Sequence, residues 1–136
     1  MVCKLWLVKH AQPEIVAEVP AKDWKLSAEG SRQSECLAER LRDAGLEQVI
    51  TSLEPKAHSL EPKAHQTGRI LAERLSIPFS SAPDLHEHRR ESTEFIGEHA
   101  RWEEMVREFF ASPDQLIFGE ETADEAHRRF SRAVRR

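Results

Sequence analysis

The chain has 136 residues, of which 39% are hydrophobic and 32% charged, which is typical of a soluble globular protein, and we predict a single domain over residues 1–136. The net charge of −4 gives no reason to expect nucleic acid or an anionic membrane as a partner. No apolar stretch approaches the roughly 18 residues of a membrane-spanning helix, and no charged-then-apolar leader is present, so we expect neither an anchor nor a signal peptide.

The two cysteines, Cys3 and Cys36, lie in an apolar run and in a helical pattern. Both positions are typical of small core residues in a reducing compartment, rather than of a disulfide or a metal pair. We therefore expect the protein to be cytoplasmic.

An apolar run over residues 3–9 leads straight into His10, and Pro13 follows. A short continuous apolar run predicts a buried strand, and the proline ends its pairing. We therefore expect strand 3–9 to lie inside a mainly parallel sheet, with His10 at its carboxyl end, where open α/β sheets build ligand sites. A lone histidine there also has a plainer interpretation, that of a hydrogen-bonded loop residue.

The next segments predict a loop, a helix and a strand. Residues 15–25 have no periodicity, which indicates a loop over the site. Ser27 suits the N-cap of an amphipathic helix of about 16 residues, which Gly45 ends. Residues 48–51 then predict a second short strand.

Residues 52–58 read Ser-Leu-Glu-Pro-Lys-Ala-His, and residues 59–65 repeat them without a change. Two copies are too few for a solenoid, so this is a tandem duplication of one heptapeptide. Seven residues turn a helix through about 700°, only ~20° short of two turns, so a helix can absorb them without rotating its buried face. Pro62 would then lie inside the helix at a cost of roughly 3 kcal/mol. We therefore predict that residues 59–62 restart the helix and that the first copy forms a separate turn.

Beyond the duplication the sequence predicts a helix ending near residues 76–78, a short strand over 79–82 and two further helices. The first of these carries an aromatic stripe over residues 102–110 that is typical of a core face. Residues 122–125 form a capping box that opens the last helix. The arginines of this helix are most simply interpreted as forming a solvent-exposed face: Arg128, Arg129, Arg132, Arg135 and Arg136. Strands that alternate with helices predict an α/β fold, a three-layer α/β/α arrangement with a mainly parallel sheet.

Four segments resemble, in the right order, motifs of the histidine phosphatase superfamily, the phosphoglycerate mutase-like proteins. Residues 7–12, Leu-Val-Lys-His-Ala-Gln, resemble the family's Leu-Val-Arg-His-Gly-Gln. Residues 26–33 resemble its Leu-Thr-x-x-Gly-x-x-Gln element, residues 63–67 its Arg-Ala-x-Gln-Thr, and residues 85–87 its Leu-x-Glu. Lysine replaces the family's arginine in the first and third segments, and Ala11 replaces a glycine.

The resemblance implies that His10 takes a phosphoryl group, that Glu87 protonates the leaving oxygen, and that Lys9, Gln12 and Lys63 bind phosphate. A partly buried glutamic acid suits the proton donor, because burial can tune its pKa upward. Lysine supplies a point charge but not the planar fork of arginine, so bidentate recognition of phosphate is lost. The scheme needs no cofactor.

Two alternatives concern the same segments. Lys56 of the first heptapeptide copy could take the place of Lys63, which we prefer because it keeps the Ala-x-Gln-Thr context. His86 and His88 would point to one side of an extended segment and could start a zinc site. Spacing provides no third ligand, so we predict no metal.

In the family, the helix that corresponds to residues 122–136 leads into a central strand ending in Thr-His-Gly, and nothing in this chain corresponds to that strand. We therefore expect a phosphoglycerate mutase-like domain that is incomplete at its C-terminus, with strand 3–9 left at a bare sheet edge. Another part of the chain could fill the edge, a second copy could pair with it as a homodimer, or the chain could be a fragment of a longer protein, which we favour. An all-helical structure, or strand 3–9 lying outside any sheet, would rule out the family.

We expect phosphoryl transfer or phosphoester hydrolysis on a small phosphorylated substrate, through a phosphohistidine intermediate on His10. The alternative is a catalytically degenerate relative that binds a phosphorylated ligand or protein partner without turnover. The two lysines and the missing second histidine favour the alternative, whereas His10 and Glu87 favour the enzyme.

Overall fold

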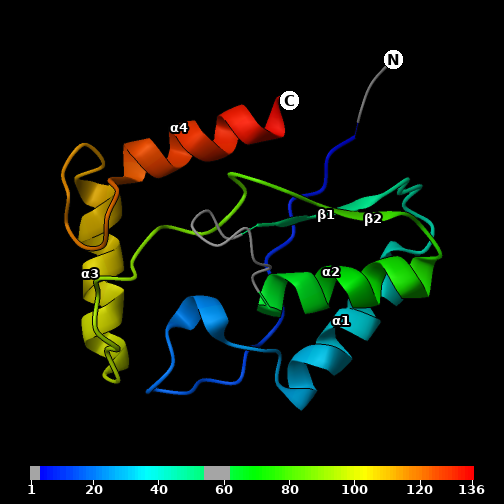
Figure 1. The fold of residues 1–136 in the computed structure, drawn as a ribbon, viewed down its shortest axis with the longest axis horizontal. Helices are drawn as coiled ribbons and strands as arrows, with labels where there is room; N and C mark the ends of the chain where they lie inside the picture. The colour runs from blue at the N-terminus through cyan, green and yellow to red at the C-terminus, as the bar shows by residue number, and fades with distance from the viewer. Residues whose placement is uncertain (1–3, 54–61) are drawn as a thin grey trace.

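The fold comes from a computed structural model that describes residues 4–53 and 62–136. The described elements are a 3-10 helix, four α-helices and two strands, coloured along the chain in Figure 1: η1 Ala21–Asp23, α1 Ala28–Leu41, β1 Val49–Ser52, α2 Pro62–Leu75, β2 Phe79–Ala82, α3 His99–Ala111 and α4 Ala123–Val134. None of these helices has the length and apolar character needed to cross a membrane.

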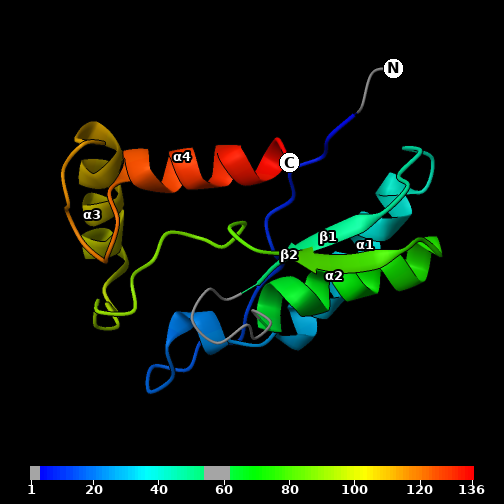
Figure 2. The ribbon, with the colours of Figure 1, turned by 45° about the horizontal axis from the view of Figure 1, so that its top comes forward.

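The sheet confirms the predicted α/β class. β1 and β2 pair in parallel, in register from Val49 opposite Phe79 to Ser52 opposite Ala82. Parallel neighbours need a crossover connection, and α2 provides it. Figures 1 and 2 show α2 beneath the two strands, with α1 against α2 and α4 on the other side of the strands.

The helix caps lie where the sequence predicts them. The Ser27 hydroxyl accepts the Gly30 N–H at the start of α1, and Gly45 adopts a φ of +69° in the turn beyond the helix end. At the start of α4, Thr122 and Glu125 satisfy each other's backbone N–H groups as a capping box. These contacts span three residues, so the local sequence alone determines them.

The core lies between α1 and α2 and under the sheet. Its apolar members are Ala38 and Leu41 of α1 and Leu71 and Ala72 of α2. A Cβ at Gly68 would lie 2.3 Å from the Thr51 Cγ2 atom. The missing side chain therefore lets α2 lie directly on the sheet.

The predicted strand over residues 3–9 is wrong for the part that the structure describes. Residues 4–10 belong to no strand among the described residues, and the side chains of Leu5 and Leu7 are 61% and 68% exposed. A strand needs a neighbour for its ladder, and the two described strands pair with each other. A segment 4–9 outside the sheet is the result that the sequence predicted would rule out the family.

The exposed segment over residues 4–10 predicts that the chain associates with itself. We expect the 136-residue chain to pair with a second copy through residues 4–10, because an exposed apolar segment that joins no described strand is a template for strand pairing. Sedimentation velocity should show a dimer fraction that rises with concentration, and Leu7→Lys should lower it. A chain that stays monomeric at all concentrations would contradict this.

The tandem duplication lies mostly outside the described residues. Residues 54–58 of the first copy, which include Lys56, and residues 59–61 of the predicted restart lie outside the described residues. α2 begins at Pro62, so within the described part the proline occupies the first position of the helix, where its missing N–H is not needed.

Candidate active site

His10 and Glu87, 77 residues apart in the sequence, meet at the centre of the site. The His10 Nε2 atom lies 2.8 Å from Glu87 Oε1, and its Nδ1 donates to the Ala11 carbonyl oxygen at 2.7 Å. His10 is largely buried, with 11% of its side chain exposed, whereas Glu87 is partly exposed. Both ring nitrogens therefore have oxygen partners, one of which is a carboxylate.

The turn after His10 is tied to both helices. Ala11 N–H donates to the Thr67 hydroxyl of α2, and Gln12 N–H donates to the Gln33 side chain of α1. The Gln12 carbonyl accepts from the backbone N–H and the hydroxyl of Ser27. The backbone bond from Ser27 belongs to an isolated antiparallel bridge between Pro13 and Leu26, so this bridge and the two helices hold the backbone beside His10.

Gly30 allows this close approach, and its replacement should disturb the site. A Cβ at Gly30 would lie 2.1 Å from the Gln12 carbonyl oxygen, a backbone atom that cannot turn aside. We expect Gly30→Ala to destabilise the fold by roughly 1–3 kcal/mol through overpacking, as measured by urea denaturation. Gly97→Ala is the matched control, because its Cβ would meet only Phe95 at an ordinary 3.5 Å. Equal stability of both variants would contradict the close contact.

Two cations complete the contacts of Glu87. Lys63, in the first turn of α2 and only 3% exposed at its side chain, places Nζ 3.5 Å from Glu87 Oε2 and donates to the Ala21 carbonyl at 2.9 Å. Arg90 places NH2 3.2 Å from the same carboxylate oxygen and lies over the Trp102 ring. The sequence argument missed Arg90. A basic residue three positions after the proposed acid was the available signal.

Lys9 and Gln12 differ in their relation to the site. Lys9 is exposed and lines the same cavity as His10 and Glu87. Gln12 is exposed and is not among the residues that line the cavity; its backbone, rather than its side chain, carries the described contacts. The structure thus brings Lys9 to the site and leaves the Gln12 side chain outside it.

The pKa of Glu87 runs opposite to the sequence expectation. Burial raises the pKa of this carboxyl, but the hydrogen bond with His10 and the charges of Lys63 and Arg90 outweigh burial and hold it well below its usual range. The expectation of an upward shift was wrong because it considered burial without the two cations. Glu87 is therefore a carboxylate at neutral pH in the unliganded site.

Arg129 of α4 fastens the loop that carries Glu87. Its NH1 donates to the carbonyls of Asp84 and His86, both at 2.9 Å, and its NH2 to the Glu87 carbonyl at 3.2 Å. The same guanidinium forms a two-pronged pair with Glu121, whose side chain is 3% exposed. Asp84 has a φ of +68°, an unfavourable backbone conformation for a residue with a side chain. Arg129 thus bonds the carbonyl of a strained residue.

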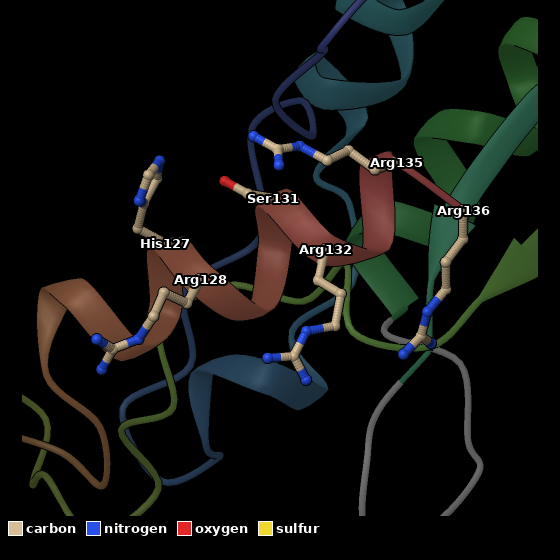
Figure 3. A pocket seen from close by; sticks show the side chains of 6 residues that line it. All are labelled: His127, Arg128, Ser131, Arg132, Arg135 and Arg136. Atoms are coloured by element: carbon tan, nitrogen blue, oxygen red, sulfur yellow. The ribbon is translucent and has the colours of Figure 1, made fainter.

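The assignment of Arg129 to a solvated face was therefore wrong, because 11% of its side chain is exposed and it reaches across to another segment. The four other arginines of that group are exposed. They line a second hollow of about 500 Å³, where Figure 3 shows side chains that spread apart from α4 and its end rather than converging: His127, Arg128, Ser131, Arg132, Arg135 and Arg136.

His86 and His88 are used in separate contacts. The His86 Nδ1 donates to the Glu87 carbonyl, whereas the His88 Nε2 donates to the Glu121 carbonyl and its ring packs on Phe109. Within residues 4–53 and 62–136, no group of three or more histidine, cysteine, aspartate or glutamate side chains could hold a metal ion. Burial lowers the pKa of both imidazoles, which favours the neutral ring.

A sequence profile described as histidine phosphatase superfamily (branch 1) matches residues 5–136, including the segment that lies outside the sheet. No protein with a curated function matches the chain.

Two solved structures of a mycobacterial glucosyl-3-phosphoglycerate phosphatase have a similar fold. The complex with inorganic phosphate gives a TM-score of 0.65 at 19% identity, covering 93% of this chain and 58% of that one. The native structure gives 0.64 at 20% identity, with 93% and 59% covered. This chain therefore spans slightly under three fifths of the length of both structures.

Proposed function

Because the chain belongs to the histidine phosphatase superfamily, we propose that it transfers the phosphoryl group of a small phosphomonoester to His10 and then to water. The match over residues 5–136 outweighs the unpaired state of residues 4–10, which the sequence argument counted against the family. The observation that carries the proposal is the contact of 2.8 Å between His10 Nε2 and Glu87 Oε1.

This contact matters because transfer of a single proton from His10 to Glu87 gives each group the protonation state that it needs. A histidine attacks phosphorus only through an unprotonated nitrogen, and a glutamic acid donates only when it is protonated. Passing the proton of His10 Nε2 to Glu87 prepares both at once. In the unliganded site Lys63 and Arg90 oppose this transfer, since they hold Glu87 in its charged form.

A phosphate group in the site would favour transfer of the proton from His10 to Glu87. Its negative charge would neutralise Lys63 and Arg90, which lie 3.5 and 3.2 Å from the carboxylate, and would lie close to Glu87 itself. Both effects raise the pKa of the Glu87 carboxyl, because a like charge disfavours ionisation and the opposite charges are taken up. Substrate binding thereby prepares its own acid.

The chemical steps follow. The His10 Nε2 attacks phosphorus, the bond between phosphorus and the ester oxygen breaks, and Glu87 protonates the departing oxygen. Water then attacks the phosphohistidine, Glu87 takes its proton, and inorganic phosphate leaves with His10 restored. Lys63 and Arg90 stabilise the charge on the equatorial oxygens, and Lys9, which lines the same cavity, is proposed to add a further phosphate contact.

A second function has a specific observation behind it. In the unliganded site Nε2 already contacts a carboxylate of lowered pKa, so the nitrogen that would attack phosphorus is engaged. A site that stays in this state would bind a phosphorylated ligand or protein partner through Lys63 and Arg90 without turnover.

One experiment separates the two functions. The chain is incubated with a small phosphomonoester labelled at phosphorus, and released phosphate and acid-labile phosphate on the protein are both counted. We expect both to appear, with the acid-labile label on His10 in a mass-spectrometric digest. Saturable binding of the ester without either product would support the binding protein and overturn the enzyme.

A further inference from the structure

The cavity that contains His10 and Glu87 extends well beyond them. Its volume is about 670 Å³, within the range of about 300–1,000 Å³ of small-molecule sites and far more than a phosphoryl group fills. The loop around η1 and the loop between β2 and α3 supply its walls. The part away from His10 therefore has room for what the phosphate is attached to.

Trp24 forms a fixed wall of this space. Its indole N–H donates to the carbonyls of Val16 at 3.0 Å and Val19 at 2.9 Å, which sets the ring orientation. Phe95 meets it edge-on, with ring centroids 6.2 Å apart and planes at 72°. Lys63 Nζ lies 5.9 Å from the Trp24 ring centroid, so the aromatic wall begins beside the cationic end of the cavity.

The apolar side chains of the same walls are unusually open to solvent. Phe95 is 49% exposed and Ile15 is 63% exposed, and both line the cavity. Exposed apolar groups that gather at a concave surface mark a binding site more often than scattered ones do. Here they flank a charged centre, so one ligand can meet both.

We propose that this part of the cavity holds the alcohol portion of a phosphomonoester that bears a flat aromatic ring, seated in the corner between Trp24 and Phe95. Two rings at 72° offer one face and one edge, which suits the offset and edge-to-face contacts that aromatic rings prefer. The inference rests on the proposed function for the position of the phosphate beside His10. It adds the substrate class.

The test uses phosphonates, which keep the charged group but have no ester bond to break. Isothermal titration calorimetry compares 2-phenylethylphosphonate with ethylphosphonate, which differ only in the ring. We expect the phenyl probe to bind about tenfold more tightly. Trp24→Leu should bring the ratio of the two dissociation constants close to one.

Phe95→Leu provides a second variant at a half-exposed position, so folding does not depend on it, and it should also reduce the ratio. Phe110→Leu is the matched control, since this phenylalanine is 70% exposed and does not line the cavity. Equal affinity of the two probes for the native chain, or a ratio that both site variants retain, would overturn the inference.

Failure of the proposed function can be distinguished from failure of the aromatic site. If the phenyl probe binds preferentially but 2-phenylethyl phosphate releases no phosphate, the aromatic site stands and the enzyme does not. If phosphate is released equally from 2-phenylethyl phosphate and ethyl phosphate and the two probes bind alike, the enzyme stands and the aromatic site does not. If neither probe binds and neither ester releases phosphate, both proposals are overturned.

Discussion

His10→Ala is expected to abolish phosphate release and the acid-labile label together, because the substitution removes the atom that bonds to phosphorus. Loss of a nucleophile costs roughly a thousandfold or more in kcat, far beyond the effect of losing one binding contact. The measurement is phosphate release from a small phosphomonoester at saturating substrate, with the melting temperature as a check of folding.

His127→Ala is the matched control, since it removes an exposed histidine from α4. It should leave both readouts unchanged. Residual label in the His10→Ala chain would place the phosphoryl group on another residue.

Glu87→Gln separates the acid from the nucleophile. The amide still hydrogen-bonds to His10 but carries no transferable proton, so we expect kcat to fall by roughly 100-fold to 10,000-fold. The acid-labile label should persist in this variant when the leaving group is already a good one, because such an ester needs little protonation. Loss of label with every ester would make Glu87 a structural partner of His10 rather than a proton donor.

Arg129→Lys is expected to reduce kcat strongly in a folded protein. Lysine keeps the charge that faces buried Glu121, but its single ammonium cannot span the carbonyls of Asp84, His86 and Glu87 as the planar fork does. The loop would then hold Glu87 loosely, and loss of position by about 1 Å costs roughly 100-fold. Arg129→Met is less informative, because it takes the closest cation from buried Glu121, leaves Arg89 at 3.6 Å as the remaining described cation, and could unfold the chain.

The pH profile distinguishes positioning from plain stability. If Glu87 moves away from Lys63 and Arg90, its pKa in the unliganded site rises toward the ordinary value, so the acidic limb of the kcat/KM profile should shift to higher pH in Arg129→Lys. Arg132→Lys, an exposed neighbour on the same helix, should change neither kcat nor the profile. An unshifted profile with full kcat in Arg129→Lys would remove Arg129 from the site.

Local sequence determined much of this protein. The Ser27 cap, the capping box at Thr122 and the strands at 49–52 and 79–82 depend on residues within a few positions of each other, so a pattern in the chain is enough to predict them. The order of the family motifs pointed to His10 and Glu87, which the structure places in contact.

Only the tertiary structure decided the remainder. Arg129 left the predicted solvated face because a segment some 40 residues away offered it three carbonyls, and no pattern on α4 records that partner. The pKa of Glu87 falls rather than rises because the hydrogen bond with His10 and the charges of Lys63 and Arg90 together outweigh burial. Residues 4–10 have the composition of a strand but, in the part of the chain that the structure describes, no strand beside them, and a ladder needs both. Hydrogen bonds and charges act through space, so these three outcomes depend on which segments the fold brings together.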